Sequence, residues 1–425
     1  MQFLSYWHET APAFASGAQG PVRGHYDVAI VGAGFTGLGA ARKLAMEGRS
    51  VVVLEARSVG SGASGRNGGH LNNGVSHSYL DVRARFGREK ARSIYRAYDQ
   101  AIETVQRVIA EEGIACDFRP SGKLKLASKP AHYENLARIA AAIREDVDPD
   151  IHMLSKADLG REVVSDAFHG ALLQEKSAMM HMGRYAVGLG EAAARRGAVI
   201  YQNTPVTSAQ QHGKGWKLNT PAGHVTADKV LLATGAYTDG AFPWFRRRIV
   251  PVGSFIIATR PLTAKEVANT MPGNRTCVNS RNIGNYFRLS PDNRLIFGGR
   301  ARFSGRSDQQ SDARSGRILR AALASVFPQL AEVRIEYCWG GLVDMTTDRY
   351  PRAGQAEGLY FSMGYSGHGA QLATHMGEIM ADLITGKTNR NPWDGLPWAA
   401  VPFHTGKPWF LPLVGQYFKF LDLIR

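Results

Sequence analysis

The segment from Val28 to Leu38, VAIVGAGFTGL, restricts the possible folds of this chain more than any other stretch. A short apolar run leads into Gly32, Gly34 and Gly37, which fill the pattern G-x-G-x-x-G, and a helix-forming stretch follows. In such a turn the first glycine permits the bend, the second lets a pyrophosphate approach the backbone, and the third lets the helix pack on the strand. The helix N-terminus also offers free N–H groups to phosphates. The segment therefore predicts a Rossmann-like dinucleotide site.

An acidic residue at the end of the next strand supports this interpretation. The apolar run 50–54 leads to Glu55, close to the spacing of roughly 20 residues at which a carboxylate binds a ribose hydroxyl. The alternative is a glycine-rich turn in an ordinary α/β protein. The strand, the glycines, the helix and Glu55 together favour the dinucleotide site.

Three further segments place glycine where the backbone can approach a ligand. Residues 59–74 read VGSGASGRNGGHLNNG, which cannot form the interior of a regular element; the alternative for them is a flexible surface loop. Residues 228–236, DKVLLATGA, and 358–369, GLYFSMGYSGHG, each predict a buried strand followed by a turn. The last turn leads into a helix over 370–385, whose N-terminus we expect to face a cofactor.

The remaining pattern predicts a second domain built on an antiparallel sheet. An apolar stripe at three- and four-residue spacing predicts one long helix over 88–112. Strands are expected over 118–127 and at several places in 241–338, where alternation and Gly/Asn punctuation are typical of antiparallel pairing. We expect residues 396–425 to form a capping extension.

Composition and charge exclude several other classes of protein. With 425 residues the chain is long enough for two or three cores of ~100–200 residues each. No uncharged apolar run reaches ~18 residues and the N-terminus lacks a signal-peptide pattern, so we expect a cytoplasmic enzyme without membrane contact. Cys116, Cys277 and Cys338 form neither a disulfide framework nor a metal-ligand spacing. The net charge of +15 is scattered and no nucleic-acid motif accompanies it, so we expect no nucleic-acid partner.

These motifs occur together and in an order that resembles a known family. The opening VAIVGAGFTG with Glu55, the GASGRNGG loop, the LLATGA turn and the GYSGHG junction are similar to those of the D-amino-acid-oxidase-like family of FAD-dependent oxidoreductases. Within that family, Ser5-Tyr-Trp, residues 62–69, Trp339-Gly-Gly and residues 364–369 most resemble the gamma-glutamylputrescine oxidoreductases. The resemblance covers nearly the whole chain.

The resemblance implies that the dinucleotide is FAD, held by residues from all of these segments. The pyrophosphate would lie on the first glycine turn, the adenosine ribose on Glu55, the adenine near Arg57 and Val206, and the flavin along the 62–69 loop and the last junction. The full set of expected cofactor residues is Gly32, Gly34, Phe35, Thr36, Gly37, Glu55, Ala56, Arg57, Gly62, Ala63, Ser64, Arg66, Asn67, Gly68, Gly69, Val206, Thr234, Gly235, Gly341, Gly364, Gly367, His368 and Gly369.

Two departures from family patterns affect the chemistry. Some relatives attach flavin covalently through a histidine near position 66 or a cysteine near the last junction; here position 66 is arginine and residues 358–375 contain no cysteine, which implies non-covalent FAD. Members that act on α-amino acids often use an arginine shortly after the Trp-Gly-Gly strand, and residues 339–345 contain none. This favours an amine substrate, with Arg288 as an alternative source of positive charge.

The expected reaction is therefore oxidation of a C–N bond in an amine such as a gamma-glutamylputrescine-like polyamine derivative. Hydride would pass to flavin N5, the imine would hydrolyse, and oxygen or another acceptor would reoxidise the flavin. Alternatives are a D-amino acid or glycine/sarcosine-type oxidase, and a flavoprotein subunit that delivers electrons to a partner. Candidate residues beside the flavin or in the substrate pocket are His70, His368, Tyr286, Arg288, Trp339 and Tyr365, each with core packing or a structural hydrogen bond as the alternative.

These expectations give a fold class and a set of domain boundaries. The class is α/β, with a Rossmann-like FAD-binding domain and a discontinuous α+β substrate domain on an antiparallel sheet. The FAD-binding domain is expected to comprise residues 1–85, 178–240 and 340–395, the substrate domain 86–177 and 241–339, and the C-terminal extension 396–425.

Overall fold

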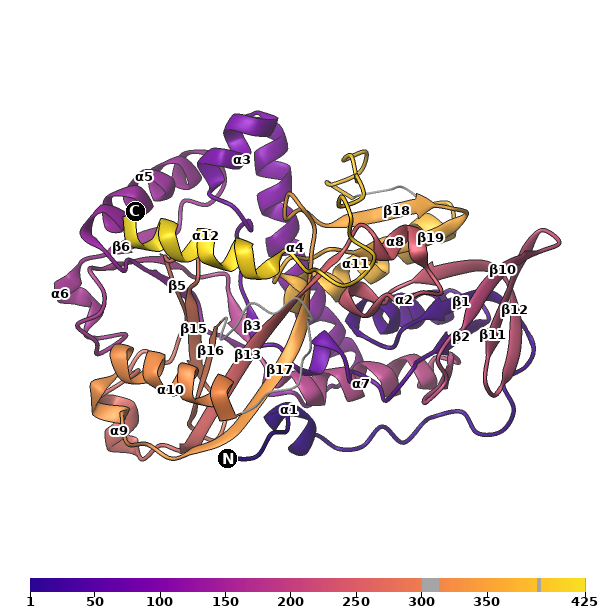
Figure 1. The fold of residues 1–425 in the computed structure, drawn as a ribbon, viewed down its shortest axis with the longest axis horizontal. Helices are drawn as coiled ribbons and strands as arrows, with labels where there is room; N and C mark the ends of the chain where they lie inside the picture. Colours follow the sequence, from indigo (N-terminus) through magenta and orange to yellow (C-terminus); the bar gives the residue numbers. More distant parts are fainter. Residues whose placement is uncertain (300–312, 388–390, 425) are drawn as a thin grey trace.

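The computed structural model describes residues 1–299, 313–387 and 391–424, and Figure 1 shows them as two parts side by side, each built on a large sheet. Small parts of the expected domains lie outside the described residues, namely 300–312, 388–390 and Arg425. Across the described part, no helix combines the length and apolar character needed to cross a bilayer. The mixed α/β class expected from the sequence is confirmed.

The first sheet contains the glycine-turn strands. Its members are β1 (His25–Val31), β2 (Val51–Leu54), β9 (Val199–Tyr201), β10 (Ser208–His212), β11 (Gly215–Thr220), β12 (Gly223–Leu232), β18 (Arg352–Ala356) and β19 (Leu359–Met363). The order is β10-β11-β12-β1-β2-β9, with β19 also paired to β12 and then to β18. β1 is parallel to β2 and β12, as are β2 to β9 and β12 to β19.

Alternation along β1 explains why this sheet is covered on both faces. Val28 and Ile30 pack with the helices on one face, whereas Ala29 and Val31 belong to a separate core on the other face. The elements around this half are α1 (Tyr6–Glu9), α2 (Phe35–Met46), α4 (Arg88–Glu112), α7 (Met182–Arg195), α8 (Pro243–Arg246), α11 (Gly369–Ile384) and the 3-10 turns η1 (Ala63–Gly65) and η2 (Gly235–Tyr237). The helix expected over 88–112 is α4.

The second sheet has the antiparallel character expected from the sequence. Its members are β5 (Lys123–Leu126), β6 (Ile151–Leu154), β7 (Ala171–Gln174), β13 (Val250–Pro261), β14 (Thr276–Asn279), β15 (Asn285–Leu289), β16 (Arg294–Gly299) and β17 (Ile335–Met345), in the order β17-β13-β16-β15-β14-β5-β7-β6. Every pair is antiparallel except β5 with β14. Around it lie α3 (Tyr79–Phe86), α5 (Pro130–Asp146), α6 (Lys156–Leu159), α9 (Ala264–Ala268), α10 (Ala313–Val326) and η3 (Pro328–Leu330).

A small third sheet joins the two halves. It consists of β3 (His70–Leu71), β8 (Ala178–Met179) and β4 (Arg119–Pro120), in that order. β3 lies within the glycine loop of residues 59–74, whereas β4 leads into β5 of the second sheet. The third sheet therefore fixes the end of the glycine loop relative to the second sheet.

Local details differ from the sequence expectations at three places. β12 is one strand that pairs antiparallel with β11 near its start and parallel with β1 and β19 near its end, whereas a short strand and a separate buried strand were expected. Two expected domain boundaries fall inside elements, because 85/86 lies in α3 and 339/340 lies in β17. We propose boundaries at the start of α3 and the end of β17 instead.

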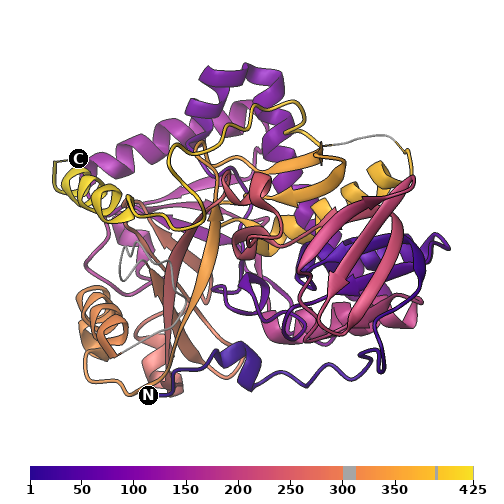
Figure 2. The same cartoon turned by 45° about the vertical axis from the view of Figure 1, so that its right-hand side comes forward.

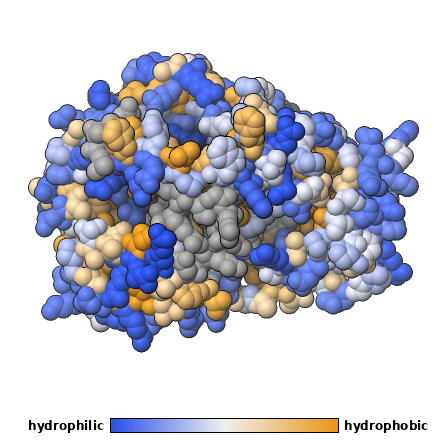
Figure 3. Space-filling view, viewed as in Figure 1, coloured by the Kyte–Doolittle hydropathy of each residue, from blue (hydrophilic) through white to orange (hydrophobic). Residues whose placement is uncertain are grey.

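The C-terminal extension includes an unexpected helix, α12 (Leu411–Ile424). Figure 2 shows it against the second part of the molecule, near α5. Asp422 accepts hydrogen bonds from the backbone N–H groups of Asn282 (2.8 Å) and Ile283 (2.9 Å), which attaches the helix to the loop between β14 and β15. Leu413, Tyr417 and Phe420 face outward and are more than half exposed. Apolar surface lies among hydrophilic surface over this region in Figure 3.

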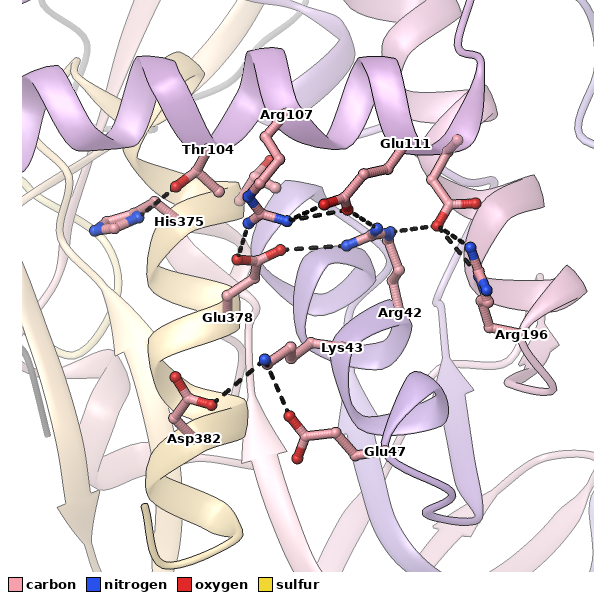
Figure 4. Close-up of polar contacts among 12 residues, drawn as sticks. Arg42, Lys43, Glu47, Thr104, Arg107, Glu111, Arg196, His375, Glu378 and Asp382 are labelled. Atoms are coloured by element: carbon pink, nitrogen blue, oxygen red, sulfur yellow. Dashed lines mark hydrogen bonds and ion pairs between the residues drawn. The ribbon is translucent and has the colours of Figure 1, made fainter. Parts of the chain in front are cut away.

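Arg42 on α2 connects three helices through a buried ion-pair cluster (Figure 4). Its side chain is 1% exposed and bonds Glu111 and Glu112 of α4 and Glu378 of α11, the last two at 2.7 and 3.3 Å. Glu112 in turn pairs with Arg196 at 3.1 Å. Because a buried charge without partners is very unfavourable, this cluster fixes the lateral position of α2 against α4 and α11.

Replacing Arg42 should therefore destabilise the whole first domain. We expect Arg42→Met to lower the free energy of unfolding by about 3–5 kcal/mol, because Glu112 would lose a buried partner. Urea unfolding measured by circular dichroism tests this. The matched control is Arg92→Met, which removes a pair with the largely exposed Glu89 and should cost less than about 1 kcal/mol. Equal small effects for both variants would contradict the role given to the cluster.

Candidate active site

A cavity of about 740 Å³ runs from the first glycine turn to the second sheet. This volume is within the range of roughly 300–1,000 Å³ that is usual for ligand and cofactor sites. Its walls come from the β1–α2 turn, the 59–74 loop, the η2 turn, the β19–α11 junction and one face of β5, β14 and β15. Segments far apart in the sequence thus meet around one space.

The three glycines of the first turn have different physical roles. Gly32 has φ +105°, and a Cβ there would lie 2.9 Å from the carbonyl oxygen of Ala233. A Cβ on Gly37 would lie 2.0 Å from the Gly32 carbonyl oxygen, so this glycine permits contact between helix and strand. At Gly34 the nearest atom is the Ser64 hydroxyl at 3.0 Å, and the residue lines the cavity. Gly34 is therefore the position where an added side chain would occupy ligand space.

Glu55 is held beside this turn by two backbone donors. Its carboxylate accepts hydrogen bonds from Ala33 N at 2.7 Å and from Arg57 N at 2.8 Å. Burial raises the pKa of the carboxyl, and the two N–H groups oppose that change. A carboxylate fixed in this way at the cavity wall is suited to accept a hydrogen bond from a ribose hydroxyl.

Two tryptophans from distant segments hold the 59–74 loop in place. The indole N–H of Trp7 donates to the carbonyl oxygen of Asn67 at 2.7 Å, and that of Trp339 donates to the carbonyl oxygen of Arg66 at 2.9 Å. Arg66 itself donates to the carbonyl oxygens of Ser61 (2.8 Å) and Gly340 (3.1 Å). The alternative of a flexible surface loop does not fit these contacts.

At the other end of the cavity, His70 faces Tyr286. Both rings line the cavity, with centroids 5.5 Å apart in an edge-to-face arrangement. Neither nitrogen of the buried His70 ring has a hydrogen-bond partner among the described residues. Burial lowers the pKa of His70 to about 3, so the ring is neutral near pH 7. An unpartnered neutral imidazole at a cavity wall is a ready hydrogen-bonding site for a ligand.

The junction between β19 and α11 forms another wall of the cavity. The Tyr365 hydroxyl lies 2.7 Å from the Thr36 hydroxyl of α2 and 2.8 Å from that of Ser362. Burial lowers the pKa of the neighbouring His368 to about 4. The N-termini of α2 and α11 therefore both border the cavity, as the two strand–glycine–helix patterns predict.

Most of the predicted site residues line this one cavity. From the cofactor set these are Gly32, Gly34, Phe35, Thr36, Glu55, Ala56, Arg57, Gly62, Ala63, Ser64, Arg66, Asn67, Gly68, Val206, Thr234, Gly235, Gly341, Gly367, His368 and Gly369, and from the catalytic candidates also His70, Tyr286 and Tyr365. Gly37, Gly69 and Gly364 lie outside the lining and permit close packing instead, against Gly32, Arg288 and Thr346 respectively.

Arg288 and Trp339 do not line the cavity. Arg288 is 1% exposed, donates to the carbonyl oxygen of Gly69 at 3.1 Å and lies over the Trp7 ring at 5.1 Å. Both residues thus support the glycine loop from behind, and we assign them structural roles. Arg288 is not placed to contact a substrate inside the cavity.

Sequence reasoning missed three cationic residues that do line the cavity. These are Lys123 and Lys125 on β5 and Arg349 on the loop after β17. A signal for the two lysines was present in the alternation KLKL over residues 123–126, which places both lysines on one face of a strand. Arg349 follows the Trp-Gly-Gly strand, but it lies beyond the segment 339–345 in which family members often have an arginine.

Comparison with known proteins identifies the family. The model for the FAD dependent oxidoreductase family, DAO, matches residues 27–383. The chain therefore belongs to the DAO family of FAD-dependent oxidoreductases, and the expected family and enzyme class are confirmed.

Individual relatives cover most of the chain. It is 34% identical over 413 residues to the probable oxidoreductase OrdL of Haemophilus influenzae, covering 94% of this chain and 93% of that protein. It is 32% identical over 399 residues to gamma-glutamylputrescine oxidoreductase of Escherichia coli, covering 92% and 90%. Glycine oxidase of Geobacillus kaustophilus is similar in structure, with a TM-score of 0.73, 23% sequence identity and coverage of 90% and 98%.

The different roles of the glycines predict a variant that folds without its cofactor. Gly34→Val should give a folded protein that lacks the flavin absorbance, because its Cβ would meet only the Ser64 hydroxyl within the protein while the side chain would occupy space in the cavity. The absorbance spectrum and circular dichroism of the purified variant test this. Gly160→Ala, at a position with open space around it, is the control and should retain flavin. A folded Gly34→Val protein with a full complement of flavin would contradict the assignment.

Burial of His368 predicts a loss of stability in acid. Above pH 6.5 the residue is neutral in both states; between that pH and about 4 only the unfolded chain takes up its proton. The free energy of unfolding should therefore fall by up to about 3 kcal/mol over this range through this residue alone. Urea unfolding of the wild type and His368→Gln across the range measures it, and the variant should show a shallower fall. His212→Gln, at an exposed hairpin, should match the wild type.

Proposed function

We propose that this protein uses non-covalently bound FAD to oxidise a C–N bond in an amine of the gamma-glutamylputrescine type. The 32% identity to gamma-glutamylputrescine oxidoreductase over most of both chains supports the substrate class. The observation that carries the proposal is the single cavity that joins the glycine turn of α2 to His70 and Tyr286 on the far side. Such a cavity can hold a long cofactor at one end and a substrate at the other.

The residues present fit FAD. Gly34 and the N-terminus of α2 would hold the pyrophosphate, Glu55 the adenosine ribose, and the loop containing Arg66 and Asn67 the flavin portion. Non-covalent attachment is supported by Arg66, whose guanidinium is occupied by two backbone carbonyls, and by the cavity lining, which includes no cysteine among the described residues. When bound, FAD supplies a hydride acceptor that oxygen or another electron acceptor reoxidises.

The protein's own contribution is orientation and a favourable protonation state. His70 and Tyr286 are placed to orient a substrate between the glycine loop and the second sheet. The positive charges of Lys125 and Arg349 on the cavity wall disfavour a further positive charge in the cavity, so a substrate amine bound elsewhere in it loses its proton more easily. A neutral amine is the form from which a hydride can leave.

A D-amino acid or glycine/sarcosine-type substrate is the alternative. The structural similarity to glycine oxidase is compatible with either class, because fold does not determine substrate. Delivery of electrons to a partner protein, with an acceptor other than oxygen, is a further alternative.

Anaerobic mixing of the yellow protein with a substrate panel tests the proposal. Gamma-glutamylputrescine should bleach the flavin absorbance fastest, and D-alanine, glycine and sarcosine should act slowly or not at all. Peroxide release in air then distinguishes an oxidase from a dehydrogenase. Bleaching by D-amino acids alone would replace the proposal by the alternative, and bleaching without peroxide, rescued by an artificial acceptor, would favour electron delivery to a partner.

A further inference from the structure

The second sheet presents two lysines to the cavity from one strand. Lys123 and Lys125 of β5 line the cavity, whereas Leu124 and Leu126 between and after them are fully buried in the core on the opposite face. In register with them on β14 are Thr276 and Val278. Because β5 lies in the interior of its sheet, between β14 and β7, the two lysines cannot move away to solvent as they could from a sheet edge.

Arg349 adds a third positive charge to the same cavity. Its guanidinium donates to His77 Nδ1 at 2.8 Å, and the other ring nitrogen of His77 is 2.8 Å from the carbonyl oxygen of Asp348. His77 is thus a neutral hydrogen-bonding partner. Burial lowers the pKa of Lys125, and the nearby guanidinium of Arg349 lowers it further.

No carboxylate neutralises these three cations within the described residues. The ammonium of Lys123, which is 7% exposed, donates to the carbonyl oxygen of Asn73 at 2.6 Å, and the ion pairs of the described chain include none of the three. Asp348, next to Arg349 in sequence, is bound by Arg352 at 2.9 Å and Arg85 at 3.4 Å. Asp81 and Asp99 attract Lys125 and Lys123 respectively, but without forming ion pairs.

The acidic residues of the cavity belong to its nucleotide end. Glu55 is beside the first glycine turn, Asp239 follows the η2 turn, and Asp344 accepts from the backbone N–H of Gly364 at 2.6 Å and lies next to Gly235. The histidines near the cations are His70, His77 and His368, and they are neutral because burial lowers their pKa values. The end of the cavity on the second sheet is therefore positive overall.

Buried positive charge without a counter-ion is unfavourable, and burial lowers the pKa of Lys123 to about 7 and also lowers the pKa of Lys125. Arg349 is the exposed member of the three. A bound anion would supply the missing charge and accept the free ammonium and guanidinium protons. The pyrophosphate of the cofactor is not that anion, because its glycine turn is on α2, across the cavity from β5.

We propose that Lys123, Lys125 and Arg349 form a binding site for a carboxylate of the substrate, so that the oxidised amine is an acidic one. The carboxylate is a group separate from the reacting carbon, and the site selects an amine that carries it over an unsubstituted diamine. The reaction itself rests on the proposed function, whereas the anion site rests on the three cations and their cavity.

A redox-inert ligand tests the site apart from turnover. Glutarate, a dicarboxylate without an amine, should perturb the flavin absorbance of the holoenzyme in a saturable manner. Lys125→Met should weaken glutarate binding about 10-fold or more, since one charge-assisted hydrogen bond is lost, and Lys125→Arg should restore most of it. Lys265→Met, which removes an exposed lysine on α9, should bind glutarate as the wild type does. Arg349→Gln provides a second variant if Lys125→Met is poorly folded.

Steady-state kinetics complete the test. In Lys125→Met the KM for gamma-glutamylputrescine should rise about 10-fold or more, whereas the KM for putrescine, a dication near pH 7 that carries no carboxylate, should not rise. Failure of glutarate to perturb the wild type, unchanged binding in both variants, or equally tight binding of sulfate would overturn the carboxylate site while leaving amine oxidation untouched. Glutarate binding that depends on Lys125, without bleaching by any amine, would support the site and reject the proposed function instead.

Discussion

The close packing of α2 against α11 is the contact on which the rest of the site depends. A Cβ on Gly377 of α11 would lie 2.3 Å from the carbonyl oxygen of Thr36, and a Cβ on Gly39 of α2 would lie 2.9 Å from that of Thr374. Two helices that start at opposite ends of the polypeptide can approach this closely only with glycine at both contacts. Their N-termini are thereby brought to the same cavity.

Polar contacts between α2 and α11 also fix the relative position of these two helices. The Tyr365–Thr36 hydrogen bond joins the two N-terminal ends, and the Arg42–Glu378 ion pair joins the helices further along. The glycine contacts set the distance between the helices, while these polar pairs oppose sliding of one along the other. Because the N-termini of α2 and α11 both border the cavity, a shift of one helix would displace the cavity-lining residues that it carries.

Much of this arrangement could be predicted from the sequence, since local patterns encode local geometry. The glycine turn after β1, the long helix α4 and the junction before α11 follow from short-range spacing of glycine and apolar residues. The order of the motifs then indicated the family. What could not be predicted depends on contacts between distant segments. Arg288 illustrates this limit, because only the fold reveals that its guanidinium turns toward Trp7 and Gly69 rather than into the cavity.

Lys123 and Lys125 show the same limit of prediction from sequence, but here the fold reveals residues that do line the cavity. KLKL over residues 123–126 is a common pattern for an edge strand with lysines in solvent, and the sequence does not disclose that β14 and β7 enclose β5. Similarly, α12 starts next to a proline in an aromatic tail and is held by Asp422, whose partners are backbone groups and the Asn282 side chain of a remote loop. In each case a long-range pairing, absent from any local window, decides whether a side chain is functional surface or solvated surface.

The charge distribution of the cavity relates these separate features to one another. Two helix N-termini border the cavity, and among the described residues its five cationic side chains (Arg57, Arg66, Lys123, Lys125 and Arg349) outnumber its three acidic ones. The histidines stay uncharged because burial holds their pKa values down. Anionic groups of a ligand are therefore attracted at both ends, and an amine between them meets neutral imidazole and phenol rings. Attraction of the charged groups orients such a ligand along the cavity, and the same field favours the deprotonated form of its amine. In the proposed amine oxidation, binding and activation thus follow from one charge distribution rather than from a dedicated base.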